Sequence, residues 1–285
     1  QPELIARFSS DARLKVVRGP GFTSTLLQFN TASPPFNNAG LRRVIAGLID
    51  YKGLVDTILL GNGTVGSAGF VHPDSPFYSA STREYPRFTV AQANQQLDSL
   101  GFRRGPDGIR VGRDGKKLDV TFLVQSNNPL RIRAAEIIAA DLKQVGINLN
   151  VKSLDPTTVQ QALWPDFDVG KGRNFEIAMW GWSAPVQAQL NLRGLFHSTP
   201  AVGTINVGGY KNPTINTLVE RMATTIDLED RKALAARVQS IVAQDLPFIT
   251  LWYPEGVYAY NPSAYDGWKY QKGQGIINKH SFIRQ

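Results

Sequence analysis

Hydrophobic and polar residues follow two different periods along the chain, one typical of strands and one typical of helices. Residues 118–124 alternate between apolar and polar positions, as a half-buried strand does. Asn128 and Pro129 then form a helix cap and a first helical residue, and an apolar stripe at helical spacing continues to Gly146. Residues 147–151 alternate again. A strand, a helix and a strand in this order predict a βαβ unit with parallel strands and a right-handed crossover.

The same two periods predict further elements on both sides of this unit. Strands are expected at residues 22–30, 175–182 and 248–253, with a short hairpin around residues 109–111. Helices are expected at residues 41–49, 54–59, 90–100, 157–163, 213–222 and 227–242. This mixture of strands and helices predicts an α/β fold.

The composition fits a globular protein with a large core. The chain has 285 residues, of which 42% are hydrophobic and 19% are charged, and this length allows one or two domains. No run of about 18 apolar residues is present, so no membrane-spanning helix is expected. The opening QPELIARFSS has no basic region followed by an apolar stretch, so we expect a cytoplasmic chain or mature or truncated material rather than a signal peptide.

Cysteine, histidine and net charge remove several classes of function. The absence of cysteine excludes disulfides, zinc–cysteine sites and thiol nucleophiles. His72, His197 and His280 are far apart and lack metal-ligand spacing, so no metal and no other cofactor is predicted. The formal charge is +8, but the basic residues are scattered in pairs such as Arg131 and Arg133. That distribution favours a solvated basic surface, and no nucleic-acid partner is predicted.

Two short motifs suggest enzymatic chemistry but lack its usual setting. GNGTVG at residues 61–66 matches the dinucleotide-binding motif, but that motif joins a strand to a helix. Here it follows a predicted helix. Its glycines are therefore better explained as residues that end the helix. GWSAP at residues 181–185 differs from GxSxG by its final proline, and no histidine base can be assigned to Ser183. A hydrolase that uses Ser183 or loop aspartates stays the alternative function. The loop aspartates are Asp155, Asp166 and Asp168. Solvation of the loop or helix capping explains their presence better than a catalytic pair does.

The stretch MWGWSAPVQAQ, residues 179–189, is the main candidate for a ligand site. It follows a predicted strand, and open α/β sheets bind ligands beyond the carboxyl ends of their strands. Indole rings offer a large stacking area and one N–H donor, which suits a permissive pocket, although two ordinary core residues explain the pattern equally well. Alternation puts Trp180 and Trp182 on one face, and Phe175, Ile177 and Met179 on the other. The polar residues that follow favour a solvated site, and they are Gln187, Gln189 and Asn191.

Six segments of the chain resemble, in the same order, parts of one protein family. The first is LLQFNTASPPFNNAGLRRVIAGLIDYKGLVDTILLGNG, in which the matching residues are Asn30, Pro35, Phe36, Arg42 and Asp50. The others are FTVAQANQQLDSLGF, AAEIIAADLKQVGINLNV, MWGWSA, NVGGYKNPTINTLVERM and DLEDRKALAARVQSIVAQDLPFITLWY. Together they span nearly the whole chain, which resembles the C-terminal half of a family 5 extracellular solute-binding protein. This is the oligopeptide-, dipeptide- and nickel-binding class of ABC importers.

The resemblance implies a fold and a division of the chain. The fold would be a lobe of a two-lobe periplasmic binding protein (class II, cluster C), with a mixed sheet and flanking helices. Residues 28–246 would form the second lobe, residues 1–27 a remnant of the first lobe, and residues 247–285 the return segment to it. The hinge crossings would lie near Gln28 and Leu246. Half of the protein, including its signal peptide, would then be missing.

The resemblance also implies a function. The chain would be the substrate-binding component of an ABC importer, not an enzyme, and would deliver a peptide or other small polar solute to a membrane permease. It would act as a monomer in the periplasm or outside the cell, with a lipid anchor on the missing N-terminus as one option. The predicted ligand contacts are Trp180, Trp182, Ser183 and Gln187, with Asn30 and Trp252 near the hinge.

One position departs from the family pattern. Peptide-binding members resemble Gly-Trp, two residues and then an aspartate that pairs with the amino group of the peptide. The corresponding residue here is Pro185, which has neither a charge nor an N–H group. We therefore expect a peptide held in another way or a different small polar solute. A module that binds a protein partner and no solute is a third alternative.

Overall fold

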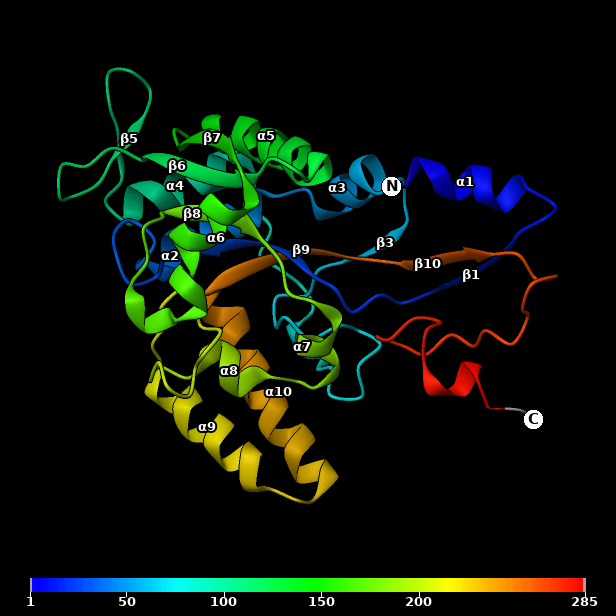
Figure 1. The fold of residues 1–285 in the computed structure, drawn as a ribbon. Helices are drawn as coiled ribbons and strands as arrows, with labels where there is room; N and C mark the ends of the chain where they lie inside the picture. Colours follow the sequence, from blue (N-terminus) through cyan, green and yellow to red (C-terminus); the bar gives the residue numbers. More distant parts are fainter. Residues whose placement is uncertain (1, 284–285) are drawn as a thin grey trace.

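A mixed sheet organises the chain in the computed structural model, which describes residues 2–283 (Figure 1). The sheet has six strands in the order β3-β9-β2-β8-β6-β7. Their bounds are β2 Thr25–Phe29, β3 Gly63–Val65, β6 Asp119–Gln125, β7 Asn148–Leu154, β8 Ile177–Trp180 and β9 Phe248–Pro254. Strand β6 runs parallel to β7 and β8, and the other neighbours are antiparallel. The predicted α/β fold with a mixed sheet is confirmed.

The predicted βαβ unit is present as β6, helix α5 (Pro129–Lys143) and β7. The side chain of Asn128 accepts a hydrogen bond from the Arg131 N–H at 3.1 Å, and Pro129 occupies the first turn, so the helix begins where its cap residues predict. After the helix, Gly146 has a φ of 82°, which a residue with a side chain rarely adopts. The chain can therefore turn directly into β7.

The other predicted helices are also found. They are α2 (Ala39–Leu48), α3 (Tyr51–Ile58), α4 (Val90–Ser99), α6 (Pro156–Leu163), α9 (Pro213–Thr224) and α10 (Leu228–Asp245). Helix α4 begins with a capping box in which Thr89 and Gln92 exchange side-chain to backbone hydrogen bonds. GNGTVG follows α3 and contains β3, with Gly61 at a φ of 75°, so it joins a helix to a strand. Among the described residues, no helix is long and apolar enough to cross a bilayer.

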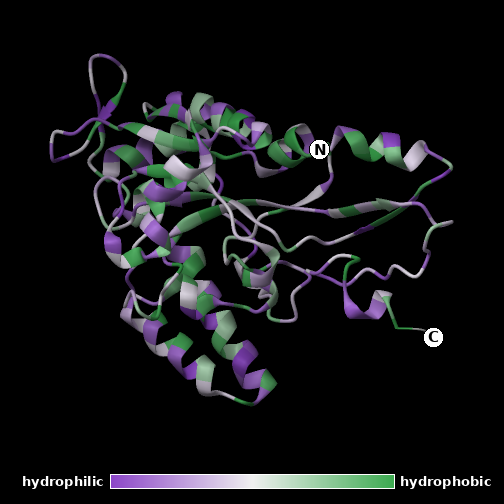
Figure 2. Ribbon diagram, viewed as in Figure 1, coloured by the Kyte–Doolittle hydropathy of each residue, from purple (hydrophilic) through white to green (hydrophobic). Residues whose placement is uncertain are grey.

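The two faces of the sheet are covered by separate hydrophobic clusters. Successive strand residues point to opposite faces, so Leu27 and Met179 belong to the first cluster, and Leu26 and Trp180 to the second. Phe175 lies in the second cluster, not with Met179 as predicted, because it precedes β8 and is outside the regular alternation. Figure 2 shows hydrophobic and hydrophilic residues mixed along the flanking helices, as expected for helices with one face on a core.

A two-stranded ribbon projects from this body on the side of the chain termini (Figure 1). It pairs β1 (Lys15–Gly19) with β10 (Gly256–Tyr260) in antiparallel register. Helix α1 (Glu3–Ser10) lies beside it and contains no buried residue. A groove of about 470 Å³ beneath α1 is lined by side chains that include Ile5, Phe8, Leu59 and Val257. The ribbon region is therefore much less buried than the sheet.

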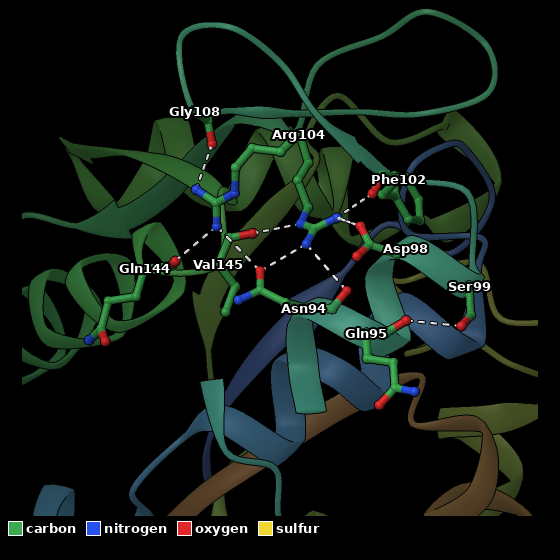
Figure 3. A network of polar contacts seen from close by, with 10 residues as sticks. Asn94, Gln95, Asp98, Ser99, Phe102, Arg104, Gly108, Gln144 and Val145 are labelled. Carbon is green, nitrogen blue, oxygen red and sulfur yellow. Dashed lines mark hydrogen bonds and ion pairs between the residues drawn. The ribbon is translucent and has the colours of Figure 1, made fainter. Parts of the chain in front are cut away.

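A buried arginine, Arg110, fixes the predicted hairpin of β4 (Arg103–Arg104) and β5 (Arg110–Val111) to helix α4 and to the turn after α5. Figure 3 shows the polar network around this hairpin, with Asn94, Asp98, Phe102 and Val145 labelled. The Arg110 side chain is 2% exposed and donates to the Val145 carbonyl at 2.8 Å and to the Phe102 carbonyl. It also donates to Asp98 Oδ1 at 2.6 Å and to Asn94 Oδ1 at 2.8 Å. Its buried charge is thus fully supplied with acceptors.

Candidate functional site

The candidate site is the carboxyl end of β8, where the chain leaves the sheet. Trp180 is the last strand residue and is paired with Leu26 of β2. Trp182 is fixed to the segment before β2, because the Ser24 N–H donates to the Trp182 carbonyl at 2.9 Å. The Trp182 N–H donates in turn to the Ser24 hydroxyl at 3.2 Å. The two indoles are therefore held at a sheet edge where α/β proteins bind ligands.

Four aromatic side chains follow one another at this edge, and we call them the aromatic row: Phe167, Trp164, Trp182 and Trp180. Neighbouring rings meet edge to face, with centroid distances of 5.1 Å between Phe167 and Trp164, 6.0 Å between Trp164 and Trp182, and 6.1 Å between Trp182 and Trp180. These geometries are favourable for aromatic pairs. The row runs from the interior to the surface, since Trp180 is 8% exposed and Phe167 is 66% exposed.

The indole N–H groups of the aromatic row are unusual in their surroundings. Those of Trp164, Trp180 and Trp182 are all buried, and none has a hydrogen-bond partner within residues 2–283. A buried tryptophan N–H normally finds an acceptor, and each unsatisfied donor costs about 1–3 kcal/mol. The row therefore contains three desolvated donors that have no acceptor among the described residues. The sequence predicted Trp180 and Trp182 as site residues, but not Trp164 or Phe167. These two residues lie in the short stretch LWPDF, residues 163–167.

The exposed end of the row is a strained turn. Asp166 and Phe167 have φ angles of 47° and 58°, a region that side-chain-bearing residues rarely occupy. Lys171 donates to Asp166 Oδ2 at 2.8 Å, and the Asp166 N–H donates to Gln161 Oε1 at 3.2 Å, so the turn is tied on both sides. The hydrogen bond from Lys171 lowers the pKa of Asp166. These contacts keep the Phe167 ring against Trp164 rather than in the core.

An arginine without a carboxylate partner lies against the same strand end. A Cβ atom placed on Gly181 would be 2.2 Å from Arg131 Nη2, so the guanidinium occupies the space that a side chain at residue 181 would need. Arg131 is half-buried, and burial alone lowers its pKa to about 10. Its Nη1 donates to Gln125 Oε1 at 3.3 Å, and no carboxylate among residues 2–283 pairs with it. In the sequence, Arg131 stands out only as one member of a scattered basic pair with Arg133.

Ser183 and Gln187 differ in how far they are available to a ligand. Ser183 is exposed at the start of helix α7 (Ala184–Ala188), and its hydroxyl makes no hydrogen bond to a histidine or carboxylate of the described chain. Gln187 is 1% exposed, accepts from the His72 N–H at 3.2 Å and donates to the Phe70 carbonyl at 2.8 Å. Gln187 therefore holds α7 to residues 70–72, and the oxygen and the nitrogen of its amide each already make a hydrogen bond.

The remaining predicted contacts lie apart from one another. Asn30 follows β2 at the end that pairs with Ile177. It therefore lies at the opposite end of the strands from Trp180. Its amide donates to the Phe175 carbonyl at 2.9 Å and accepts from the Ala32 N–H at 3.2 Å. Trp252 is opposite Thr25 on β9 and 2% exposed in the first hydrophobic cluster. The structure thus brings together Trp180, Trp182 and Ser183, but not Asn30.

The loop aspartates of the hydrolase alternative have structural partners. Asp155 accepts from the Thr158 N–H at 3.0 Å and caps α6, and the hydrogen bonds from Thr158 lower its pKa. Asp168 accepts from the Gly170 N–H at 2.8 Å. A lowered pKa keeps Asp155 ionised and makes it a poor proton donor. In the part of the chain that the structure describes, no cluster of three or more histidine or acidic side chains could hold a metal ion.

A cavity of about 400 Å³ adjoins this edge on the ribbon side. It lies between α7, the segment before β2 and the residues near the C-terminus, with Phe22, Ala184, Glu255, Tyr258 and Tyr270 in its lining. Because Ala184 directly follows Ser183, the cavity and the strand end are continuous along the chain.

Comparison with known sequences places this geometry in a family. Residues 1–202 match the model of bacterial extracellular solute-binding proteins, family 5 (middle). The chain belongs to this family. One relative is the oligopeptide-binding protein AppA of Bacillus subtilis, which is 25% identical over 278 residues, or 93% of this chain and 47% of AppA. The family 5 chain thus spans about half the length of the curated relatives that it matches.

Solved structures agree with the family assignment at the level of the fold. The structure of Bacillus subtilis AppA in complex with a nonapeptide matches 98% of this family 5 chain and 54% of its own, with a TM-score of 0.84 and 20% identity. NikZ from Campylobacter jejuni, in complex with Ni(L-His), matches 92% of this chain and 51% of its own, with a TM-score of 0.77 and 20% identity. Both have the mixed-sheet fold described above.

Proposed function

We propose that this chain is the substrate-binding part of an ABC importer, which captures a small polar solute and delivers it to a membrane permease. The proposal places it in the periplasm or outside the cell. Relatives named for oligopeptide, D,D-dipeptide and heme binding support a capture role and leave the cargo open. A peptide is one candidate cargo, although Pro185 offers no charge to an amino terminus.

One observation carries the proposal: near the carboxyl end of β8, three buried indole N–H donors have no hydrogen-bond partner among residues 2–283. Desolvated donors beside aromatic surface suit a site that binds a polar solute and excludes water. The hydrolase alternative has no comparable support, since Ser183 has no base within hydrogen-bond reach among residues 2–283. A protein-binding module would not need buried, unpaired donors.

The proposal includes a division of the chain into parts of two lobes. Residues 28–246 would form one lobe, and residues 1–27 and 247–285 would belong to the other, with hinge crossings near Gln28 and Leu246. The projecting ribbon of β1 and β10 and the apolar groove beneath α1 are consistent with a surface that packs on further protein. In such a protein the solute stabilises the closed state by touching both lobes.

Solute capture by tryptophan variants tests the proposed function. We expect solutes retained by the natively purified protein, identified by mass spectrometry, to be lost from Trp182→Ala. Because removing a buried indole costs about 3–5 kcal/mol of stability, Trp182→Phe is the folding control: it keeps one aromatic ring and removes the N–H donor together with part of the indole surface. It should weaken solute binding about tenfold, as the loss of one hydrogen bond in a desolvated site does.

The matched control is Trp268→Phe. Trp268 contacts Tyr260, Tyr265 and Phe282 in the ribbon region, far from β8 along the chain. Its substitution should leave solute capture unchanged. Equal affinity in wild type and both Trp182 variants, with all of them folded, would contradict a solute site at this strand end.

A further inference from the structure

The net positive charge of the chain is concentrated in one short segment. Residues 103–117, RRGPDGIRVGRDGKK, contain six basic and two acidic residues, so they carry +4 of the formal charge of +8. The longer segments on either side, residues 28–102 and 118–246, each contain equal numbers of basic and acidic residues. We call residues 103–117 the basic hairpin, which consists of β4, β5 and the loop after each of them.

Strand pairing brings basic residues that are separate in the sequence into one unit. Arg103 lies opposite Val111 of β5, and Val111 in turn lies opposite Lys117. Directly opposite residues of antiparallel strands share a face, so Arg103 and Lys117 flank Val111 on one face. Arg104 and Arg110 occupy the other face, where both donate to backbone carbonyls of the turn after α5. The face with Arg103 and Lys117 is therefore the one turned away from the body.

The backbone of the basic hairpin is fixed. In the first loop the Gly105 N–H donates to the Ile109 carbonyl at 2.8 Å, and in the second loop the Gly112 N–H donates to the Lys116 carbonyl at 2.8 Å. Arg110 ties the base of the hairpin to α4 and to the turn after α5. A partner that binds the hairpin therefore does not have to order its backbone first, which lowers the cost of binding.

Most of the exposed cations of the hairpin have no counter-ion. Lys117 pairs with Asp107, and the buried Arg110 pairs with Asp98 of α4. Asp114, the second acid of the hairpin, accepts from the backbone N–H of Lys116 at 3.1 Å. Four exposed basic residues make no salt bridge within residues 2–283, and they are Arg103, Arg104, Arg113 and Lys116. The hairpin therefore presents uncompensated positive charge to the solvent.

The hairpin offers this charge without an apolar anchor. Among residues 103–117 no large hydrophobic side chain is exposed. Protein interfaces usually depend on aromatic or aliphatic side chains that become buried at their centre. An anionic lipid surface needs no such anchor, since a cluster of roughly four to eight lysines and arginines is enough to attract it. The composition of the hairpin therefore favours a lipid surface over an acidic protein.

The position of the hairpin leaves the rest of the molecule free. Its loops project from the end of the body opposite to the ribbon of β1 and β10 (Figure 1). The hairpin leads directly into the amino end of β6, and β6 is parallel to β8. It therefore lies at the opposite end of the strands from the candidate site at the carboxyl end of β8. A surface bound to the hairpin would cover neither the ribbon nor this site.

We infer that the basic hairpin binds the anionic phospholipid surface of a membrane. The attraction acts on the phosphate charge of the lipid headgroups and does not require one lipid species. The inference adds a membrane contact to the proposed function and rests on it only because an importer component works beside a membrane. Such a contact keeps the protein near the surface in which its permease would lie.

Co-sedimentation with vesicles tests this inference. The intact chain is mixed with vesicles of phosphatidylcholine alone or of phosphatidylcholine and phosphatidylglycerol in equal amounts. At about 0.1 M salt we expect at least about tenfold tighter binding to the anionic vesicles, because each lysine or arginine near such a surface strengthens binding by a factor of about five. The difference should largely disappear at about 1 M salt, where the Debye length falls to about 3 Å.

Two double variants with the same change in net charge locate the contact. Arg113→Gln with Lys116→Gln should weaken binding to the anionic vesicles at least about tenfold. The matched control is Arg221→Gln with Arg237→Gln, since both arginines are exposed on α9 and α10 and make no salt bridge within the described chain. It should keep the affinity within about twofold of wild type, because these residues lie outside the hairpin. Both variants replace exposed side chains and should unfold at the urea midpoint of wild type.

Three results would overturn the inference. They are equal binding to the two kinds of vesicle, no binding to either kind, and equal weakening in the two double variants. The last result would mean that total charge decides the affinity and not the hairpin. The proposed function is judged separately, by the solutes that the natively purified protein retains. These solutes should be the same in wild type and in the hairpin variant, whatever the vesicles show.

Discussion

Arg110 and Arg131 are both withdrawn from water, yet their surroundings are opposite. Arg110 is 2% exposed and donates to three backbone carbonyls and to the side chains of Asp98 and Asn94. Arg131 has one long contact with Gln125 and no carboxylate partner within the described chain. The first arginine joins the hairpin of β4 and β5 to helix α4 and to Val145. The second lies at a strand end where ligands bind in α/β folds.

The difference separates stability from binding. A buried charge with a full set of acceptors is costly to remove, because its partners are left without donors. A desolvated charge without a counter-ion contributes nothing comparable to folding and is available to a ligand. The same reasoning applies to the indole donors of Trp164, Trp180 and Trp182, which are buried and have no acceptor in the described part of the chain. Replacing Arg110 should therefore lower the free energy of unfolding, whereas replacing Arg131 should not.

The largest effect on stability is expected for Arg110→Met. It leaves the carbonyls of Phe102, Asn94 and Val145 without this donor, and should lower the free energy of unfolding by about 3 kcal/mol or more in urea titrations. Arg104→Met is the control, because Arg104 belongs to the same network but is exposed. It should cost less than about 1 kcal/mol. A similar loss from both would mean that burial does not decide the value of these contacts.

A smaller effect is expected from His72 on acidification. His72 is fully buried beside Phe22 and Tyr253, and burial lowers its pKa to about 4 although Asp74 opposes the shift. Between pH 6.5 and 4 the unfolded chain takes up a proton that the folded chain does not. The free energy of unfolding should therefore fall across this range, by at most about 1.4 kcal/mol per pH unit, and this contribution should level off below pH 4.

The control for this pH dependence is a pair of histidine variants. His72→Gln should flatten the slope between pH 6.5 and 4, whereas His280→Gln should keep it, since His280 is exposed in the last described segment. A slope unchanged in His72→Gln would assign the acid sensitivity to other groups. The result bears on the site, because Gln187 of α7 accepts from the backbone N–H of His72.

The smallest change in stability is expected for Arg131→Met. Replacing a charge that lacks a partner by an apolar side chain should leave the free energy of unfolding unchanged or raise it by about 1 kcal/mol. Urea titration beside Arg110→Met gives the direct comparison. A loss as large as that of Arg110→Met would show that Arg131 is structural.

Most of the sheet and its large helices could be predicted from the sequence. The βαβ unit is the clearest case, because residues 118–124 and 147–151 alternate and Asn128 and Pro129 form a standard helix start. Helix α7 and the following helix α8 (Leu192–Phe196) were not predicted, because five residues carry too little periodicity. Helix α7 is held instead by Gln187, whose partners are more than a hundred residues away.

The candidate site was only partly accessible to sequence reasoning. Trp180 and Trp182 follow a recognisable strand, so their position at a sheet edge could be predicted. Arg131, Trp164 and Phe167 come from other segments, and only the strand order β2-β8-β6-β7 brings those segments to the same edge. Whether a buried indole or guanidinium group has a hydrogen-bond partner depends on three-dimensional packing. No local sequence pattern predicts it.

Chemical-shift mapping of the tryptophan indoles tests the central claim most directly. The chain has five tryptophans, and single Trp→Phe variants assign their indole N–H signals. On addition of the solutes that the protein retains, we predict that the signals of Trp164, Trp180 and Trp182 shift together while that of Trp268 stays fixed. Shifts confined to Trp268, or an unchanged spectrum with the solute bound, would contradict a binding site at the carboxyl end of β8.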